Sequence, residues 1–274
     1  MDGVLYRGEL PMPGLRDFFS LVGGHPFVLV TNKSTVSAVD CVEKLGRMGV
    51  AVPTEAVLTV SDATSRYLAG MAPPVSRALV LGSTALKTAV SLAGLVLVPE
   101  ESGADVVVIG LDRTFSYATL SRAVRLVGEG AAFVATSLDP VLLTEAGVVP
   151  GAGALVAAIR ACIDVVPVCV GKPSVAMFEM AMSQLGVLAG ETLVIGDNLA
   201  SDIAGGAAAG ARTALLLSGV TPADSDAATA PGSAGDGDAE AGEGGACVAG
   251  PVRPDYVFPG LPELSAFLRE SWAG

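Results

Sequence analysis

Short aliphatic runs that alternate with helix-like stretches constrain the fold of this chain more than any other feature of its sequence. The runs are nearly all apolar, which is typical of strands that are covered on both faces. Because strands that alternate with helices form βαβ units, the pattern predicts an α/β fold with a mainly parallel sheet and helices on both faces. The strands are expected at Phe27–Val30, Ala78–Leu81, Leu95–Val98, Asp105–Ile109, Ala132–Ala135, Val168–Val170, Leu193–Ile195, Thr213–Leu217 and Tyr256–Phe258, and the helices include Val36–Met48, Tyr117–Glu129, Ala152–Cys162, Ser174–Leu185 and Leu199–Ala209.

Two breaks in this rhythm predict two domains. Pro73-Pro74 interrupts the chain after one helical pattern, and Asp164–Pro167 interrupts it again. The segment between the breaks has a βα rhythm of its own, so we expect an inserted domain at residues 73–166. Residues 1–72 and 167–274 would then form one core domain.

The stretch of about residues 221–252 differs from the rest of the chain in composition. It is rich in Ala, Gly, Asp, Glu and Ser and has almost no large apolar side chain. Such a segment buries too little surface to offset the entropy lost on ordering. We therefore predict a disordered acidic insert within the second part of the core domain.

The charge and the cysteine content of the chain indicate which partners and which cellular compartment to expect. The net charge is −12, which is unfavourable for binding to nucleic acid or to an anionic membrane. The four cysteines are scattered and form no C-x-x-C pair, and the apolar runs are too short to span a membrane. We expect a cytoplasmic protein with reduced thiols that binds neither nucleic acid nor membranes.

Polar residues that can bind phosphate and a hard cation follow two of the expected strands. Thr31 and Asn32 come after one strand and Asp197 after another, so they should meet at the carboxyl edge of a parallel sheet. A helix expected to start after Ser34 would point its N-terminal N–H groups to the same place. Lys172, in a Gly-Lys-Pro segment, supplies positive charge for a phosphate.

Carboxylates in the same segments suggest a magnesium ion. Asp197 offers the hard oxygen that Mg²⁺ prefers, and Asp202 can hold a metal-bound water or orient Lys172. Asp2 can protonate a leaving oxygen or activate a water. Each segment alone is more often a cap, a turn or a loop, but all four in this order are hard to obtain by chance.

Together these segments resemble the haloacid dehalogenase (HAD) superfamily, and within it the NagD-like, or 4-nitrophenylphosphatase-like, subfamily IIA branch with a C2-type cap. The first family motif reads D-x-D-G-V-L-x-x-G, and the chain matches its second half. The matching segments are Asp2–Gly8, Thr31-Asn32-x-Ser34, Lys172 and Gly196–Asp202, with Gly110–Tyr117 and Val149–Gly153 in the cap. The resemblance covers nearly the whole chain except the acidic insert.

The resemblance implies a Rossmann-like core, an inserted α/β cap and a two-step phosphatase mechanism. In that mechanism one aspartate attacks phosphorus and a second, here Asp2, acts as general acid and then as general base. Asp197 and the Asp2 backbone carbonyl would bind Mg²⁺, with Asp202 behind them. The remaining site residues that the resemblance implies are Thr31, Asn32, Lys172 and Asn198 for the phosphoryl group and Asp112 and Arg113 of the cap for the substrate.

One departure from the family pattern concerns the nucleophile. Met1 occupies the middle position of D-x-D, so the attacking aspartate would lie immediately before Met1, and the central strand that leads into it is expected to be missing as well. A start assigned at an internal methionine and a truncated, inactive relative both explain this. The start at an internal methionine is favoured because every other motif is intact. The codons upstream of Met1 would decide between the two explanations.

The leading interpretation is a Mg²⁺-dependent phosphatase of a small phosphomonoester: a sugar phosphate, phosphoglycolate, glycerol phosphate or nucleotide. The alternative is a non-catalytic protein that binds phosphorylated metabolites. A dinucleotide-dependent enzyme is disfavoured because no G-x-G-x-x-G follows Gly82-Ser83. Ser137-Leu138-Asp139 replaces the usual Asn-x-Asp of the cap, and pyridoxal phosphate specificity is not indicated. Homodimers through the cap occur among relatives and are possible for this chain.

Overall fold

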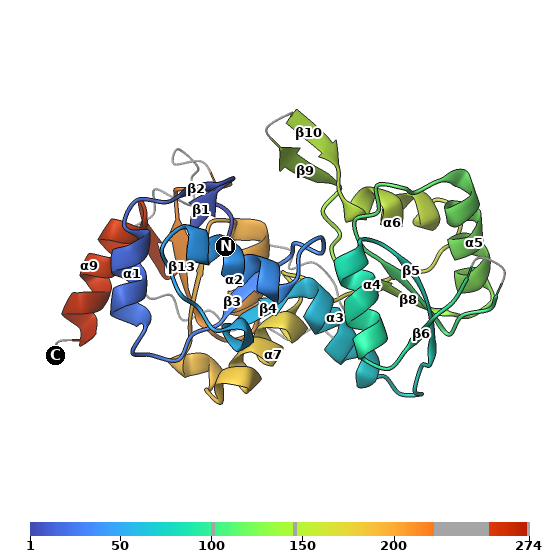
Figure 1. The fold of residues 1–274 in the computed structure, drawn as a ribbon, viewed down its shortest axis with the longest axis horizontal. Coiled ribbons are helices and arrows are strands. Elements are labelled where there is room, and N and C mark those ends of the chain that lie inside the picture. The colour runs from blue at the N-terminus through green and yellow to red at the C-terminus, as the bar shows by residue number, and fades with distance from the viewer. Residues whose placement is uncertain (100–101, 145–146, 222–251, 273–274) are drawn as a thin grey trace. The chain divides into compact units, whose positions relative to one another are not determined.

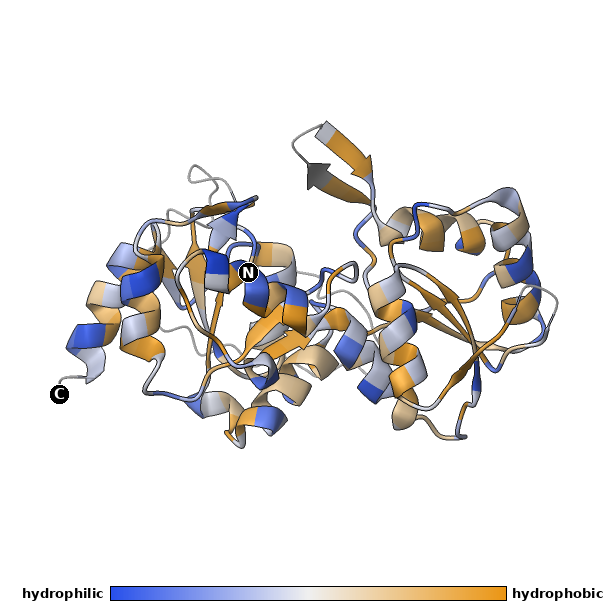
Figure 2. Cartoon of the chain, viewed as in Figure 1, coloured by the Kyte–Doolittle hydropathy of each residue, from blue (hydrophilic) through white to orange (hydrophobic). Residues whose placement is uncertain are grey.

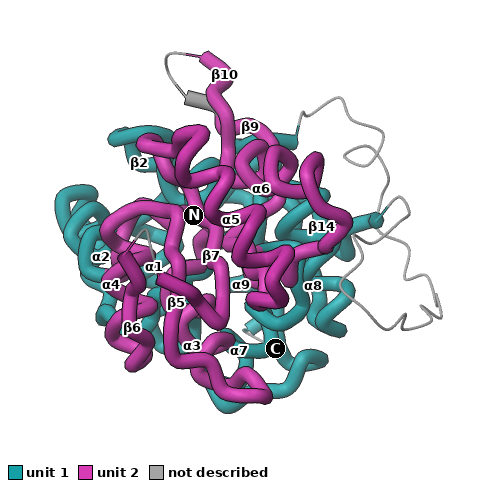
Figure 3. Tube along the Cα trace, turned by 90° about the vertical axis from the view of Figure 1, so that its right-hand side faces the viewer, with its two compact units in different colours: residues 1–30, 39–57, 172–274 teal, residues 31–38, 58–171 magenta. Residues whose placement is uncertain are grey.

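The computed structural model describes residues 1–99, 102–144, 147–221 and 252–272. It divides into two compact units (Figures 1 and 3). Unit 1 comprises Met1–Val30, Val39–Val57 and Lys172–Gly274, and unit 2 comprises Thr31–Ala38 and Leu58–Gly171. Nearly all of the predicted acidic insert lies outside the described residues. The predicted domain boundaries at residues 73 and 166 stay a prediction.

Unit 2 is built on a continuous five-stranded sheet in the order β11-β8-β7-β5-β6, in which every neighbouring pair is parallel. All four residues of the central strand β7 are buried, and Figure 2 shows hydrophobic bands along the sheet. The strands are β5 (Arg77–Leu81), β6 (Val96–Leu97), β7 (Val106–Ile109), β8 (Ala132–Ala135) and β11 (Val168–Cys169). The helices are α3 (Val60–Ala69), α4 (Thr84–Leu92), α5 (Tyr117–Gly128) and α6 (Ala152–Arg160).

A hairpin of two antiparallel strands, β9 (Val141–Thr144) and β10 (Gly147–Pro150), extends from unit 2 (Figure 1). Its residues Val141 and Val148 are exposed. The strand and helix pattern of the sequence does not predict this hairpin. It places neither a strand nor a helix between β8 and α6.

Unit 1 contains a three-stranded parallel sheet in the order β12-β13-β14. Its strands are β12 (Leu193–Gly196), β13 (Arg212–Leu216) and β14 (Tyr256–Phe258). The hairpin of β1 (Tyr6–Arg7) with β2 (Leu10–Pro11) also belongs to unit 1. A further pair, β3 (Leu29–Thr31) with β4 (Val57–Thr59), falls at the division, because Thr31, Leu58 and Thr59 are assigned to unit 2. The helices are α1 (Leu15–Val22), α2 (Ala38–Arg47), α7 (Val175–Leu185), α8 (Ala204–Ala208) and α9 (Leu261–Trp272), with short turns η1 (Thr54–Ala56), η2 (Ala189–Glu191) and η3 (Leu199–Ile203).

A cavity of about 440 Å³ lies in unit 1 and is bordered by both β3 and β12. We call it the β3–β12 groove; its lining includes Met1, Val28–Val30, Leu193–Ile195, Lys172 and Asp202. Among the described residues, β3 has a sheet neighbour only in β4 and β12 only in β13. The groove therefore lies between the edges of two separate sheets.

The predicted α/β fold with a parallel sheet is confirmed, and every predicted strand overlaps an observed one. The helix expected at Val36–Met48 is observed as α2, Ala38–Arg47, and starts two residues later than predicted. The Ser34 carbonyl accepts hydrogen bonds from the hydroxyls of Ser61 and Ser83, and its own hydroxyl accepts one from the Leu111 N–H. These tertiary bonds hold the segment out of the helix.

None of the helices in the described part of the chain is long and apolar enough to cross a membrane. Among the described residues, Cys41, Cys162 and Cys169 form no disulfide, and Cys247 falls outside the described residues.

Candidate functional site

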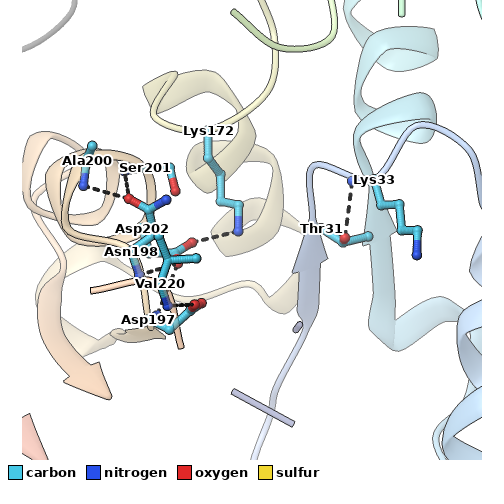
Figure 4. Close-up of polar contacts among 9 residues, drawn as sticks. All are labelled: Thr31, Lys33, Lys172, Asp197, Asn198, Ala200, Ser201, Asp202 and Val220. Atoms are coloured by element: carbon cyan, nitrogen blue, oxygen red, sulfur yellow. Dashed lines mark hydrogen bonds and ion pairs between the residues drawn. The ribbon is translucent and has the colours of Figure 1, made fainter. Parts of the chain in front are cut away.

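A buried ion pair marks the candidate site in unit 1. The Lys172 ammonium lies 2.6 Å from Oδ1 of Asp202, and the two side chains are only 11% and 9% exposed (Figure 4). Lys172 belongs to the Gly-Lys-Pro turn that leads into α7, and Asp202 lies in η3. Removing either partner of so buried a pair would leave an unpaired charge, so Asp202 holds the Lys172 ammonium in place.

The second carboxylate oxygen of Asp202 holds the loop that follows β12. Its Oδ2 accepts hydrogen bonds of 3.2 Å from the backbone N–H groups of Asp197 and Asn198. A Cβ at Gly196 would come within 2.1 Å of Asp202, so only glycine fits at the end of the strand. Asp202 therefore orients Lys172 and fixes the backbone of Asp197 together.

Asp197 comes directly after β12 and is buried. Its Oδ2 accepts a 2.8 Å hydrogen bond from the Val220 N–H, and its carbonyl accepts one of 3.0 Å from Thr221. Gly3 approaches the same carboxylate: a Cβ there would lie 2.3 Å from Oδ2, and its φ of +76° already favours glycine. The turn after Asp2 and the turn after β13 therefore both contact Asp197.

Burial and charge set the ionisation of these groups. Burial alone would raise the pKa of Asp202, but the Lys172 ammonium and its hydrogen bond lower it below the ordinary value. Burial raises the pKa of Asp197 despite the opposing Val220 hydrogen bond. Burial also lowers the pKa of the Met1 α-amino group, and the nearby Lys172 lowers it further. Asp197 is thus a buried carboxylate that a bound cation would stabilise.

Two other predicted residues of unit 1 have different surroundings. The side-chain oxygen of Asn198 accepts hydrogen bonds from the N–H groups of Ala200 and Ser201, so it caps η3. Asp2 is exposed, and its backbone forms a bridge with Tyr6. The Asp2 carboxylate is therefore accessible to solvent one residue from the groove-lining Met1.

The predicted phosphate and cap residues Thr31, Asn32, Asp112 and Arg113 lie in unit 2. The Thr31 hydroxyl accepts a hydrogen bond from the Lys33 N–H (Figure 4). Asp112 accepts hydrogen bonds from the backbone and the hydroxyl of Thr114, and Arg113 is exposed. The bond between Ser34 and Leu111 described above brings the two segments that carry these four residues together within unit 2.

Ser137, which departs from the family pattern, forms a local turn. Its hydroxyl donates to Oδ2 of Asp139 at 2.9 Å and accepts from the Asp139 N–H at 3.0 Å. Serine therefore keeps the hydrogen-bonding role expected of this position.

Sequence reasoning missed the contacts that Gly3, Gly219, Val220 and Thr221 make with Asp197. A Cβ at Gly219 would lie 1.9 Å from the Asp197 carboxylate. The only local signal is a Ser-Gly-Val-Thr segment after a strand, which is also typical of an ordinary turn. In the described residues, no three His, Cys, Asp or Glu side chains gather into a metal-binding group.

Comparisons with known proteins agree on one family. Residues 1–96 match the family described as haloacid dehalogenase-like hydrolase, and residues 169–264 match the one described as HAD-hydrolase-like. The 5'-nucleotidase YutF of Bacillus subtilis is 34% identical over 223 residues, which cover 81% of this chain and 86% of that protein.

Solved structures give the same result. The 4-nitrophenylphosphatase of Thermotoga maritima superimposes with a TM-score of 0.83 at 31% identity, covering 97% of this chain and 94% of that one. The glycerol phosphate phosphatase of Mycobacterium tuberculosis, crystallised in complex with magnesium, superimposes with a TM-score of 0.83 at 32% identity, covering 98% and 76%. The likeness thus extends along nearly the whole of the present chain.

Proposed function

Because the chain belongs to the haloacid dehalogenase-like hydrolase superfamily, in its NagD-like, subfamily IIA branch, we propose that it is a phosphoric monoester hydrolase that acts on a small phosphorylated metabolite with the help of Mg²⁺. The observation that carries the proposal is the buried Lys172–Asp202 pair, whose carboxylate also holds Asp197 at the end of β12. The names of the relatives, a 5'-nucleotidase, a 4-nitrophenylphosphatase and a glycerol phosphate phosphatase, support phosphomonoesters as the substrate class.

The donor set fits a magnesium ion. Mg²⁺ is usually held by one or two carboxylates, waters and a substrate phosphate, and Asp197 with the Asp2 carbonyl offers hard oxygens of this kind. Gly3 lies against the Asp197 carboxylate, which places the Asp2–Gly3 backbone beside it. A relative crystallised with magnesium supports the choice of ion. When bound, the ion would supply positive charge for the phosphoryl oxygens.

We assign the other roles by the family motif that each residue matches. Lys172, Thr31 and Asn32 hold the phosphoryl oxygens, and Asp202 keeps Lys172 oriented. Asp2, exposed and next to Met1, protonates the leaving oxygen and then activates the hydrolytic water. Asn198 acts mainly by capping the loop that follows Asp197.

The remaining assignments concern the cap and the nucleophile. Asp112 and Arg113 contact the rest of the substrate from a cap at residues 73–166. The nucleophile is an aspartate placed immediately before Met1, which forms an aspartyl-phosphate that water then hydrolyses.

The test measures phosphate release from 4-nitrophenyl phosphate by a protein extended before Met1 with an aliphatic strand that ends in Asp. We expect turnover that requires Mg²⁺ and stops with a chelator, and a loss of about 10²–10⁴-fold in Asp2→Asn. Asp17→Asn, an exposed carboxylate of α1, should keep full activity and is the matched control. A folded, extended protein without Mg²⁺-dependent turnover would refute the proposal.

A second candidate is a non-catalytic protein that binds phosphorylated metabolites. The buried Lys172–Asp202 pair favours it, because a buried ammonium can bind a phosphoryl group without catalysing its transfer. Calorimetry of this chain with glycerol 3-phosphate and Mg²⁺ should detect binding. Lys172→Met should abolish the heat of binding if the pair is part of the site.

A further inference from the structure

Residues 31–38 belong to unit 2, although the chain on either side of them belongs to unit 1 (Figure 3). They include Thr31 and Asn32, the residues proposed to hold the phosphoryl group, and we call residues 31–34 the phosphate segment. Its last residue, Ser34, is only 5% exposed. The contacts of Ser34 show how the phosphate segment is held within unit 2.

The Ser34 carbonyl is held by two hydroxyls that come from different elements. It accepts one hydrogen bond from Ser83 and another, of 3.4 Å, from Ser61 of α3. Ser83 also caps α4, because its hydroxyl accepts a hydrogen bond from the Leu86 N–H. The turn at Gly82-Ser83 therefore uses one hydroxyl both to begin a helix and to fix the backbone of Ser34.

The Ser34 hydroxyl bonds to the loop that follows β7. It accepts a hydrogen bond of 3.4 Å from the Leu111 N–H. A Cβ at Gly110 would lie 3.4 Å from this hydroxyl and 2.6 Å from the Leu86 side chain, so glycine leaves room for the close approach. Leu111 is the first residue of Leu111–Arg113, which includes the residues proposed to contact the rest of the substrate, and we call this run the substrate loop.

The hydrogen bonds of Asp112 in the substrate loop are local. This side chain accepts from the N–H and the hydroxyl of Thr114, two residues further along the chain. They shape the turn but do not attach it to the phosphate segment. The bond between Leu111 and Ser34, by contrast, joins residues that are 77 positions apart in the sequence, and it links the substrate loop to the phosphate segment.

We propose that Ser34 is a positioning residue that holds the substrate loop against the phosphate segment, so that the two parts of unit 2 that meet the substrate keep a fixed separation. The two bonds to its carbonyl anchor the backbone of Ser34, and its hydroxyl then holds the backbone of the loop. This inference rests on the proposed function, because it takes the phosphate segment as the place of the phosphoryl group and the substrate loop as the contact to the rest of the substrate.

A loop that is held in place before the substrate arrives favours binding, because ordering a mobile loop costs free energy at the moment of association. A substrate that forms hydrogen bonds with the substrate loop should therefore bind more weakly once the loop is released from Ser34. A substrate that offers the loop no hydrogen bond should bind about equally well in both cases. The difference between two such substrates separates a positioning role from general damage to the fold.

Amide hydrogen exchange of the full chain tests the attachment of the loop without any ligand. Ser34→Ala removes the acceptor of the Leu111 N–H and should speed exchange of the substrate-loop amides by about 3–10-fold. Ser65→Ala is the matched control, because the Ser65 hydroxyl also joins two elements of unit 2, by donating to the Ala89 carbonyl, but bonds to neither segment. Unchanged exchange in Ser34→Ala, or an equal increase in both variants, would overturn the proposal.

Steady-state kinetics tests the consequence for the substrate, with the protein of the phosphatase assay described above. The two substrates are phenyl phosphate, whose ring forms no hydrogen bond with the loop, and whichever of glycerol 3-phosphate, glucose 6-phosphate and AMP is hydrolysed fastest. Ser34→Ala should raise KM for the second substrate by about 3–10-fold and KM for phenyl phosphate by less than about twofold, with kcat nearly unchanged. Equal increases in both KM values would contradict a positioning role.

The two experiments separate this inference from the proposed function. If the protein hydrolyses none of the esters, the proposed function fails, and hydrogen exchange still decides whether Ser34 holds the substrate loop. If the esters are hydrolysed but Ser34→Ala changes neither the exchange nor the ratio of the KM values, the proposed function stands and this inference fails.

Discussion

The two units differ in how fully their parallel strands are buried. In unit 2, β7 lies between β8 and β5, and all four of its residues are buried. In unit 1, β12 has β13 on one side and the groove on the other, and its aliphatic residues are half-buried. Both strands are similarly apolar, so the difference comes from their neighbours and not from their side chains.

The two sheets also differ in whether charged site residues lie beside them. The sheet of unit 2 has a continuous hydrophobic core that includes Ile109, Phe133 and Val156. In unit 1 the ion-paired Lys172 and Asp202 line the groove, and Asp197 directly follows β12. An edge next to a site leaves room for a further group, whereas a closed sheet does not.

The largest effect on stability is expected at the ion pair. Lys172→Met should lower the free energy of unfolding by about 3–5 kcal/mol, because Asp202 is left buried and unpaired. Urea unfolding measures it. The double variant Lys172→Met with Asp202→Asn should recover much of the loss, and a double variant no more stable than the single one would show that the charge is not the cause.

The closed sheet of unit 2 provides the next test. Ile109→Ala should lower the free energy of unfolding by about 2–4 kcal/mol, because the side chain is fully buried in the central strand. Val96→Ala on the edge strand β6, where the side chain is 62% exposed, should change it by less than about 0.5 kcal/mol. Similar costs at both positions would contradict the description of the sheet.

Strand β12 should respond less than the central strand of unit 2. Val194→Ala should lower the free energy of unfolding by only about 1 kcal/mol, because the side chain is half-buried although it lies against Gly206 of α8. Urea unfolding measures it. A cost as large as that of Ile109→Ala would contradict the comparison.

The smallest effect is expected at Asp105 in unit 2. Hydrogen bonds from the backbone N–H groups of Ser76 and Arg77, together with the Ser76 hydroxyl, hold the pKa of this carboxyl below its ordinary value. A lowered folded-state pKa stabilises above the unfolded value of about 3.9 and is lost as the pH falls through the folded value. Asp105→Asn should therefore lower the melting temperature by about 1–3 °C at pH 7 and less at pH 3.

Much of the fold was predictable from the sequence because periodicity is a local signal. The aliphatic runs at Val106–Ile109 and Leu193–Gly196 read as strands without knowledge of their partners. The start of α2 was not predictable, because Ser34 is held by residues distant in the sequence. The hairpin β9–β10 was missed because its turn lacks the usual Asn-Gly or Asp-Gly pair.

The candidate site was predictable in part, because short motifs are also local signals. Lys172, Asp197 and Asp202 stand in short motifs, and the structure brings these three together in unit 1. The close approach of Gly3 and Gly219 to Asp197 depends on tertiary packing, which no spacing reveals. The capping bonds of Asn198 likewise follow from the local turn geometry of η3.

Amide hydrogen exchange of β12, with β7 as the internal reference, tests the difference between the two sheets most directly. Every second amide of β12, the set that points away from β13, should exchange with little protection, while the β7 amides stay protected. Equal protection of all β12 and β7 amides would contradict the account.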